Sequence, residues 1–371
     1  MLILALPLLA TLQAATITVG SGSSYDWSSI QDAIDDASDG DVISVSTGTY
    51  VESLDLSGKE LTIQASGTTS RTVIAPSSSA AAITVDQGES AVVIQGFTIQ
   101  PSGGRAIWVA DSSPSFVDLV IDGAGTSASG QGGAIYVTGG APSFDQLEVI
   151  DSRAAYGGDI FVTDHADVLI TDSNFEGARA TYGGSLWADG AAVTLISVTV
   201  VDSRSTNSGG FAYLENAELY ATDLELEDPT GDTCYGAGLF ARDHSHVEWD
   251  GGGVSGAIAD EYASGYTGGA VHLRGSSTFE GSSLLFEDNT AYAGGAMDVQ
   301  DSASASLVAC SFVDNRAHTK GGGLRAYDSA EVSCDSCSFE GNTAPEGGAV
   351  DVSVDASFND LDGFYEDNEA T

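Results

Sequence analysis

The chain has 371 residues, of which 54 are acidic and 11 are basic, so its formal net charge at pH 7 is −43. A surface this negative repels the phosphates of nucleic acids and of anionic membranes, which excludes both as partners. Polyuronates would be repelled as well, except at a local basic patch.

The first segment, Met1–Ala15, is apolar and ends in Ala14-Ala15, a pair of small residues of the kind that signal peptidases cleave. The sequence therefore predicts a secretory signal peptide over 1–15 and a single domain over 16–371. The apolar segment is too short to span a membrane, and no other apolar run is long enough, so no transmembrane segment is expected. We expect an exported protein, either secreted or held at the cell surface or outer membrane.

Apolar residues recur at helical spacing shortly after this leader, at Ile30, Ala33, Ile34 and Ala37. This pattern predicts a short amphipathic helix. We expect residues 16–60 to form an N-terminal cap and a first coil, with the helix covering the open end of the repeats that follow.

A tandem repeat begins at Gly132. Each repeat opens with a glycine motif: a pair of glycines, or a close variant, followed by a small residue and then by an aliphatic, a variable and a second aliphatic residue. Successive glycine motifs are 25 and 26 residues apart at the start of the array, which indicates stacked coils rather than a globule. The glycine motifs are GGAIYV (Gly132–Val137), GGDIFV (Gly157–Val162), GGSLWA (Gly183–Ala188), GGFAYL (Gly209–Leu214), GAGLFA (Gly236–Ala241), GGAVHL (Gly268–Leu273), GGAMDV (Gly294–Val299), GGGLRA (Gly321–Ala326) and GGAVDV (Gly347–Val352).

The alternation within each glycine motif indicates a strand whose two aliphatic residues point inward, as with Ile135 and Val137. A turn follows, and one stacked position of that turn holds only Asp, Gly or Asn, which tolerate left-handed backbone. We predict an all-β fold from about Val42 to Thr371: a single-stranded, right-handed parallel β-helix with three sheets. The turn column is Asp111, Gly139, Asp164, Gly190, Asn216, Asp243, Gly275, Asp301 and Asp328.

A second motif closes each coil, and its clearest forms are FEDNTA (Phe286–Ala291), FVDNRA (Phe312–Ala317) and FEGNTA (Phe339–Ala344). The aromatic column should stack in the core. The asparagines should form a ladder of amides at one bend, because a buried amide is stable only when it is paired. The chain stops where the next glycine motif would be due, so we expect the C-terminal coil to be uncapped or truncated. The ladder residues are Asn289, Asn315, Asn342 and Asn368.

Together the two motifs resemble the repeats of the chlamydial polymorphic outer membrane proteins, above all in CSFVDNRA (Cys310–Ala317) and CSFEGNTA (Cys337–Ala344). The likeness covers roughly the last two-thirds of the chain. More broadly, the stretch Asp26–Gly67 is similar to the N-terminal opening of pectin-lyase-like β-helices. The first resemblance implies a surface adhesin, although the C-terminal barrel of that family has no counterpart in this sequence.

Of the four cysteines, Cys310 and Cys337 occupy the same position of successive repeats. Two residues stacked about 5 Å apart lie within disulfide geometry, so we predict a disulfide between them after export. The Cys334–Cys337 pair has no second CxxC or paired histidines at ligand spacing, and no zinc site is predicted. No cofactor is expected, and stacked turn aspartates leave calcium as the one candidate cation.

The variable position of the glycine motif points outward and carries six aromatic residues in succession. We expect an exposed aromatic ladder on the first sheet, with sugar rings or the apolar face of a protein partner lying along it. Loop insertions before Gly132, at Glu227–Tyr235 and at Gly256–Thr267 could wall this surface. The ladder is Trp108, Tyr136, Phe161, Trp187, Tyr213 and Phe240.

The same outward row continues with polar residues, His272, Asp298, Arg325 and Asp351. Two coils separate the two aspartates, about 9.6 Å, which is near the carboxylate spacing of an inverting glycosidase. The alternative interpretation is a structural Asp-Arg-Asp charge ladder. The isolated fragments Asp164-His165 and Asp243-His244-Ser245-His246 look like acid–base groups, but both are expected in the turn after the first strand and are interpreted as turn residues.

Two functions therefore remain open. The first is a noncatalytic adhesin that binds a glycan or a surface protein through this sheet. The second is a polysaccharide hydrolase or lyase with Asp298 and Asp351 as its acids and Arg325 or His272 assisting. The second interpretation lacks the Asp-rich, Gly-His-Gly and Arg-x-Lys signatures expected of polygalacturonases.

Overall fold

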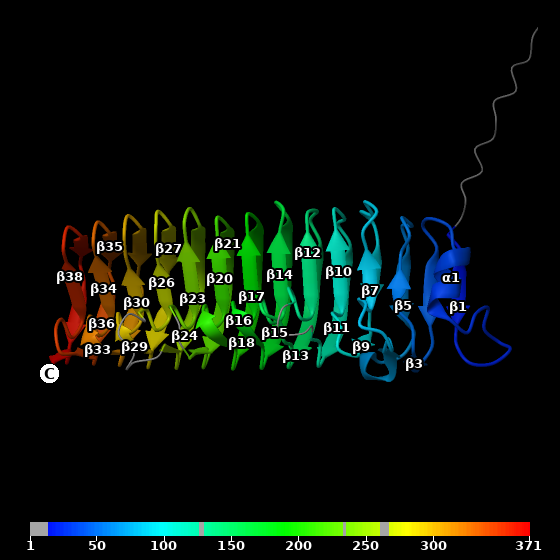
Figure 1. The fold of residues 1–371 in the computed structure, drawn as a ribbon, viewed down its shortest axis with the longest axis horizontal. Helices are drawn as coiled ribbons and strands as arrows, with labels where there is room; N and C mark the ends of the chain where they lie inside the picture. Colours follow the sequence, from blue (N-terminus) through cyan, green and yellow to red (C-terminus); the bar gives the residue numbers. More distant parts are fainter. Residues whose placement is uncertain (1–13, 126–129, 233–234, 260–266) are drawn as a thin grey trace, which may run out of the picture.

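The computed structural model describes residues 14–125, 130–232, 235–259 and 267–371, so nearly all of the expected signal peptide lies outside the described residues. The chain forms a right-handed parallel β-helix of about 13 turns (Figure 1). Three parallel sheets run along its length, and helix accounts for only 3% of the residues. The predicted fold class is confirmed.

A short helix covers the N-terminal end, as predicted. Ser29 is the N-cap of helix α1 (Ile30–Asp36), and its hydroxyl accepts a hydrogen bond from the backbone of Asp32. Ile30 and Ile34 of the helix are fully buried. Strand β1 (Thr16–Val19) precedes the helix and pairs in parallel with β2 (Val42–Val45). The β-helix thus starts earlier than the expected boundary near Val42.

Sheet B holds the glycine motifs and has 12 strands, which confirms that these motifs lie on one face. Its strands are β4 (Leu54–Asp55), β7 (Ile83–Val85), β10 (Ile107–Ala110), β12 (Ile135–Thr138), β14 (Ile160–Thr163), β17 (Leu186–Asp189), β20 (Ala212–Glu215), β23 (Leu239–Arg242), β26 (Val271–Leu273), β30 (Met297–Val299), β34 (Leu324–Tyr327) and β38 (Val350–Ser353).

Sheet C is the shortest and precedes each double glycine; its strands are β16 (Arg179–Tyr182), β19 (Arg204–Ser208), β22 (Thr230–Gly231), β25 (Ile258–Ala259), β29 (Thr290–Ala293), β33 (Arg316–Lys320), β37 (Thr343–Ala344) and β41 (Glu369–Ala370).

Sheet A has 21 strands and bends within each coil. Besides β1 and β2, the strands are β3 (Gly48–Tyr50), β5 (Thr62–Ala65), β6 (Thr72–Ile74), β8 (Val93–Gln95), β9 (Thr98–Ile99), β11 (Ser115–Asp122), β13 (Ser143–Ile150), β15 (Asp167–Glu176), β18 (Ala192–Val201), β21 (Glu218–Glu227), β24 (His246–Ser255), β27 (Thr278–Ser282), β28 (Leu285–Glu287), β31 (Ser304–Val308), β32 (Ser311–Val313), β35 (Glu331–Asp335), β36 (Ser338–Glu340), β39 (Ser357–Leu361) and β40 (Phe364–Glu366).

The double glycine forms the corner between sheets C and B. A Cβ atom on Gly158 would collide with the carbonyl oxygen of Gly184 in the next coil, and one on Gly184 would collide with that of Gly210. At these two positions only glycine fits, whereas the coil with the variant motif accommodates Ala237 at the equivalent position. The turn after sheet B is also as predicted, because all nine residues of the turn column have positive φ angles, from 47° at Asp111 to 70° at Gly139.

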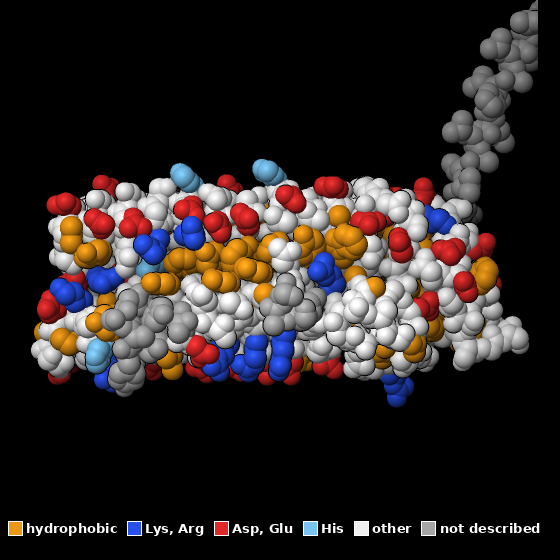
Figure 2. Space-filling view, in the orientation of Figure 1, with side chains coloured by type: hydrophobic (Ala, Val, Ile, Leu, Met, Phe, Trp, Pro, Cys, Tyr) orange, Lys and Arg blue, Asp and Glu red, His pale blue; other side chains and the backbone are white. Residues whose placement is uncertain are grey.

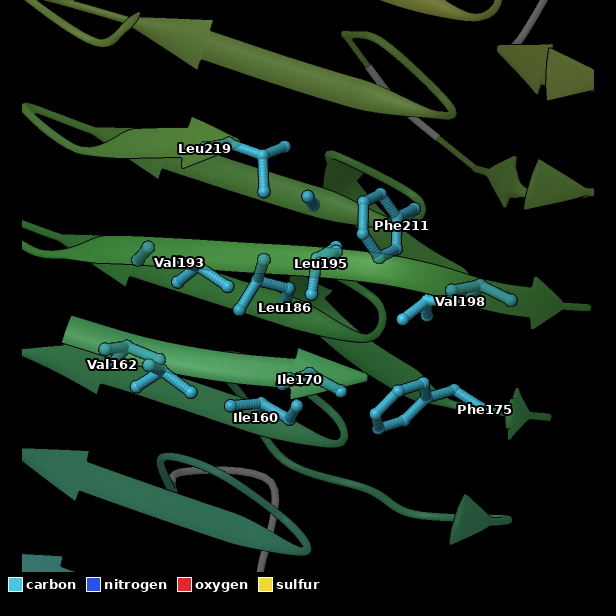
Figure 3. Close-up of a cluster of buried hydrophobic side chains, with 14 of the residues drawn as sticks. Ile160, Val162, Ile170, Phe175, Leu186, Val193, Leu195, Val198, Phe211 and Leu219 are labelled. Atoms are coloured by element: carbon cyan, nitrogen blue, oxygen red, sulfur yellow. The ribbon is translucent and has the colours of Figure 1, made fainter. Parts of the chain in front are cut away.

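Identical residues stack along the core. The rings of Phe312 and Phe339 lie 4.6 Å apart with a 7° interplanar angle. In the asparagine ladder, the side-chain amide of Asn289 donates to Asn315 at 2.9 Å and that of Asn315 donates to Asn342 at 3.0 Å. Asn342 donates in turn to Asn368. Both predicted ladders are confirmed, and Figure 3 shows the aliphatic and aromatic packing of the middle coils.

One core position departs from this pattern. Asp159, the small residue of its glycine motif, points into the corner that the asparagines occupy in later coils, and it is fully buried. Its carboxylate accepts a hydrogen bond from Ser185, while the hydroxyl of Ser152 faces it without reaching good hydrogen-bond geometry. Burial raises the pKa of Asp159 to about 8, against the weaker opposing effect of the two hydroxyls.

Stability should therefore depend on pH through Asp159. Its folded-state pKa lies near 8 and its ordinary pKa is 3.8. The contribution is fully present below about pH 4 and is lost as the pH rises towards 8, at up to about 1.4 kcal/mol per pH unit. Asp159→Asn should flatten this slope in unfolding free energies measured from pH 4 to 8. The exposed Asp189→Asn removes the same formal charge and should leave the slope unchanged; equal slopes in all three proteins would contradict the assignment.

Candidate functional site

Two rows of side chains meet on the outside of the corner between sheets B and C. The first is the outward position of the glycine motif on sheet B, and strand register places Tyr136, Phe161, Trp187, Tyr213 and Phe240 on successive strands. The second row is the residue just before each double glycine. It contributes three tyrosines, Tyr156, Tyr182 and Tyr235. These three and the five residues of the first row are together called the aromatic strip.

Ring stacking holds the first row together. The centroids of Trp187 and Tyr213 are 4.1 Å apart with an interplanar angle of 3°, and those of Tyr136 and Phe161 are 5.4 Å apart. Tyr156 and Tyr182 stand almost perpendicular to Trp187, at 84° and 82°. The predicted ladder therefore exists as a stacked row with a second wall beside it.

The predicted exposure of this ladder is wrong for four of its six members. Phe161, Tyr213 and Phe240 are each 5% exposed and Trp187 is 9% exposed. Neighbours in the row cover the ring faces and the tyrosines of the second row cover their sides, so only ring edges reach the surface. The half-buried Trp108 lies outside the packed cluster, and Tyr136 sits at its margin. Figure 2 shows the strip as an apolar band along the long axis.

Arginines border this band on a chain that is otherwise acidic (Figure 2). The guanidinium of Arg105 lies 4.6 Å from the ring centre of Tyr136, and that of Arg274 lies 6.0 Å from the ring centre of Tyr235. Arg242 donates a hydrogen bond of 3.2 Å to the hydroxyl of Tyr213. Within the described residues Arg105 forms no ion pair, and its partial burial lowers its pKa. Arg242 pairs with Glu215 and Asp243, and Arg274 pairs with Asp301 at 3.4 Å, so Arg105 supplies the positive charge of this arginine rim that no described carboxylate neutralises.

The outward row of sheet B continues into a group of polar side chains, called the polar cluster below, of which the first three are buried and the last two half-buried: His272, Thr267, Asp298, Gln300 and Arg325. Arg325 donates from Nε and Nη2 to the two carboxylate oxygens of Asp298, both at 2.8 Å. Gln300 donates to Asp298 Oδ2 at 2.7 Å. The side chains of His272 and Asp298 have no exposed surface. Arg325, with 13% exposed, closes the cluster.

His272 keeps one nitrogen without a partner. Its Nδ1 lies 3.0 Å from the carbonyl oxygen of Thr267, which can only accept, so Nδ1 carries the proton. The hydroxyl of Thr267 is 2.7 Å from the same nitrogen and Asp298 Oδ2 is 3.5 Å away. Burial lowers the pKa of His272 to about 4, against the opposing carboxylate of Asp298. The ring is therefore neutral at pH 7, and no hydrogen-bond partner of Nε2 lies among the described residues.

This geometry bears on the expected pair of catalytic acids. Both oxygens of Asp298 are buried and hydrogen-bonded, so Asp298 does not present a carboxylate to a water molecule. Asp351 stands opposite Arg325 on the next strand, is half-buried, and accepts a hydrogen bond from Ser353 at 2.8 Å. The Asp-Arg-Asp charge ladder that was the alternative interpretation describes this row better.

Sequence reasoning missed Thr267 and the three tyrosines of the second row. All four immediately precede a glycine motif, which is the variant Gly-Ala-Gly after Tyr235, so one column of the repeat holds them. That shared position was the available signal. The expected walls before Gly132, at Glu227–Tyr235 and at Gly256–Thr267 lie partly outside the described residues, as does Cys234.

The remaining predicted residues have plainer surroundings. His165 and His244 are exposed in the turn after sheet B, which fits their interpretation as turn residues. Cys310 and Cys337 occupy neighbouring coils as free thiols, so their disulfide stays a prediction. Among the described residues, no group of three His, Cys, Asp or Glu side chains is arranged to hold a metal ion, and no helix is long and apolar enough to cross a membrane.

A shallow hollow of about 360 Å³ lies outside sheet A, away from the aromatic strip. Glu248 and Glu280 stand on adjacent strands there, next to Tyr220 and Asp250. The hydroxyl of Ser282 donates to Asp250 at 2.5 Å, and Glu248 is 3.0 Å from Nε2 of His246. These contacts account for the hollow as a hydrated, acidic sheet surface.

No protein-family model and no curated protein matches this sequence. Solved structures with a similar fold include a pectin methylesterase from carrot, with a TM-score of 0.45, 12% identity, and coverage of 74% of this chain and 83% of that one. A polygalacturonase from Erwinia carotovora ssp. carotovora has a TM-score of 0.41 and 13% identity, over 93% and 95% of the chains. A mannuronic acid-specific family 6 polysaccharide lyase from human gut microbiota has a TM-score of 0.41 and 10% identity, over 91% and 83%. All three are polysaccharide-active enzymes, and the likeness is one of fold.

Removing one member of the buried ion pair should be costly. Arg325→Leu leaves the carboxylate of Asp298 buried without its cation, and we expect a loss of about 3–5 kcal/mol in unfolding free energy. The double variant Asp298→Asn/Arg325→Leu removes the uncompensated charge and should recover most of that loss. Arg316→Leu, at an exposed arginine of β33, should change stability by less than about 0.5 kcal/mol. A chemical-unfolding series decides the matter; a small effect of Arg325→Leu would refute the pairing as a buried one.

Proposed function

We propose that the protein is exported and acts as a noncatalytic binding protein whose aromatic strip and arginine rim recognise a polysaccharide lying along sheet B. The observation that carries this proposal is the strip itself. It is a continuous apolar band on an acidic surface, and its rim gathers Arg105, Arg242 and Arg274. Contiguous apolar patches on soluble proteins commonly mark binding surfaces.

The stacking of the strip favours one mode of recognition. Sugar rings cannot lie flat on Phe161, Trp187 or Tyr213, because neighbouring rings already cover their faces. The edges that reach the surface carry the positive end of the aromatic quadrupole, and such edges complement oxygen lone pairs. Tyrosine hydroxyls and guanidinium groups beside them donate hydrogen bonds to the same kind of atom. An oxygen-rich polymer fits this surface better than the apolar face of a protein.

The charge distribution supports the same location. A net charge of −43 disfavours acidic polymers over most of the surface. The rim is the place where unpaired positive charge accompanies the rings, since Arg105 forms no ion pair within the described part of the chain. Neutral sugars, and carboxylated sugars held at the rim, are therefore the ligands to test.

Binding should weaken when the rim loses its charge. We expect a glycan array to identify a ligand of the wild-type protein, and titration calorimetry to show at least about tenfold weaker binding for Arg105→Gln/Arg274→Gln, about 1.4 kcal/mol. The control Arg71→Gln/Arg316→Gln makes the same charge change at exposed arginines away from sheet B and should bind like the wild type. Equal weakening in both double variants would show that overall charge, rather than the rim, explains the weaker binding. Wild-type protein that binds no glycan would contradict the proposal.

Catalysis at the polar cluster is the second candidate, and the unpartnered Nε2 of His272 is the observation that favours it. The proton of Nδ1 is fixed by Thr267, so Nε2 holds a free lone pair; because this nitrogen is fully buried, a substrate hydroxyl or a water would reach it only after Arg325 moved aside. Arg325, partly exposed above Asp298, would stabilise negative charge that develops beside it. This arrangement suits a polysaccharide hydrolase or lyase that uses a neutral histidine as its base.

The two candidates differ in an assay for new reducing ends. If the polar cluster is catalytic, the wild-type protein cleaves its polysaccharide and His272→Gln lowers the rate by about 10²-fold or more. The rate should rise through about pH 4 and then level off, because the basic form of His272 is present above its pKa of about 4. His165→Gln, at an exposed turn, should keep full activity. No new reducing ends from a bound polysaccharide would leave binding as the function.

A further inference from the structure

Three cysteine side chains lie together in the core near the C-terminal end of the β-helix. Cys310, Cys334 and Cys337 are 0%, 2% and 1% exposed, and all three are free thiols. Neither the aromatic strip nor the polar cluster involves them.

Their arrangement follows from the strand register. Ser311 of β32 pairs with Ser338 of β36, which puts the preceding Cys310 and Cys337 in one column of adjacent coils. Cys334 lies on β35, in the same coil as Cys337. Between the two cysteines, Ser336 has a φ angle of 57° and bends the chain. Cys337 consequently lies beside both other thiols, and its own thiol donates weakly to the carbonyl oxygens of Leu307 and Asp335, at 3.7 and 3.9 Å.

We propose that Cys337 is the shared partner of two mutually exclusive disulfides, Cys310–Cys337 between coils and Cys334–Cys337 within one coil, and that this trio is an oxidation site. Only one of the two bonds can exist at a time. The first ties adjacent coils together covalently. The second spans only the bend at Ser336 and leaves the coils joined by hydrogen bonds alone.

The chemistry needs a two-electron oxidant, for which we take hydrogen peroxide, one of the smallest. The thiolate of Cys337 attacks one peroxide oxygen, the O–O bond breaks, and a sulfenic acid and hydroxide form. The thiol of Cys310 or Cys334 then attacks the sulfur of Cys337, the S–O bond breaks, and water leaves as the disulfide forms. Two thiols together give up two electrons, which reduce one peroxide.

The position of Cys337 suits the second step. It is the one cysteine that lies next to both of the others, so either neighbour can reach a sulfenic acid formed on it. The pKa values of Cys310 and Cys334 are raised by their contacts with Cys337 and by burial. On its C-terminal side, Cys334 pairs in register with Asp360 of β39.

The test uses the full chain with Cys234→Ala as background, which removes the fourth cysteine. Folded protein is treated with hydrogen peroxide, its free thiols are counted after denaturation, and peptides are mapped without reduction. The background should lose two of its three thiols and yield both disulfides. Adding Cys310→Ala should give only Cys334–Cys337, and adding Cys334→Ala should give only Cys310–Cys337.

The decisive variant is Cys337→Ala, which should form no disulfide and keep both thiols under the same treatment. A Cys310–Cys334 disulfide in that variant, formed as readily as those in the others, would overturn the shared-partner assignment. So would background protein that yields only sulfinic acid or keeps three thiols. Circular dichroism of each reduced variant confirms that the β-helix is intact, and reduction of the oxidised background should restore all three thiols.

Discussion

The contact between coil backbones at the double-glycine corner is the constraint on which the rest of the molecule depends. The Cα atoms of Gly158 and Gly184 lie so close to the next coil's carbonyl oxygens that no side chain fits there. Each coil must therefore follow the path of the one before it, in register. Every position of the repeat becomes a column that runs parallel to the axis.

In such columns similar residues stack on one another, and their chemistry decides whether the stacking stabilises the fold. Amides stack favourably because each one donates to the next, as Asn289 and Asn315 do. Aromatic rings also stack favourably, because the shared register places them face to face. Identical charges would repel, and the row that contains Asp298, Arg325 and Asp351 alternates its sign accordingly. The columns thus explain both the apolar strip and the charge ladder that extends it.

The sequence alone predicts the structural features that depend on a single column of the repeat. The inward aliphatics, the left-handed turn and the asparagine ladder repeat at fixed positions, so their stacking could be predicted directly. The exposure of Trp187 could not, because it depends on two columns that meet across the corner. Strand parity places this ring outside the β-helix, but two tyrosines from the other side of the corner cover it: Tyr182 at the end of β16 and Tyr156, which is bridged to Tyr182. The burial of Asp298 was missed likewise, since Arg325 folds back over it.

Where a column changes its residue type, a buried polar group can be left without a matching neighbour. Asp159 lies between Ala134 and Ser185 in the column of small residues that follow the double glycines, and one of its oxygens is unpaired. His272 lies between Phe240 and Asp298, and its Nε2 is unpaired. Trp108 follows Thr84 and precedes Tyr136, and its indole nitrogen is unpaired within the described residues. Stacking pairs the polar atoms of a residue only when the next coil holds the same residue or a complementary one. Unpaired buried polar atoms therefore occur where the residue type of a column changes. Six buried side-chain atoms among the described residues lack a partner, and two of them, in Trp108 and His272, lie on the outward row of sheet B, one at each end of the aromatic strip.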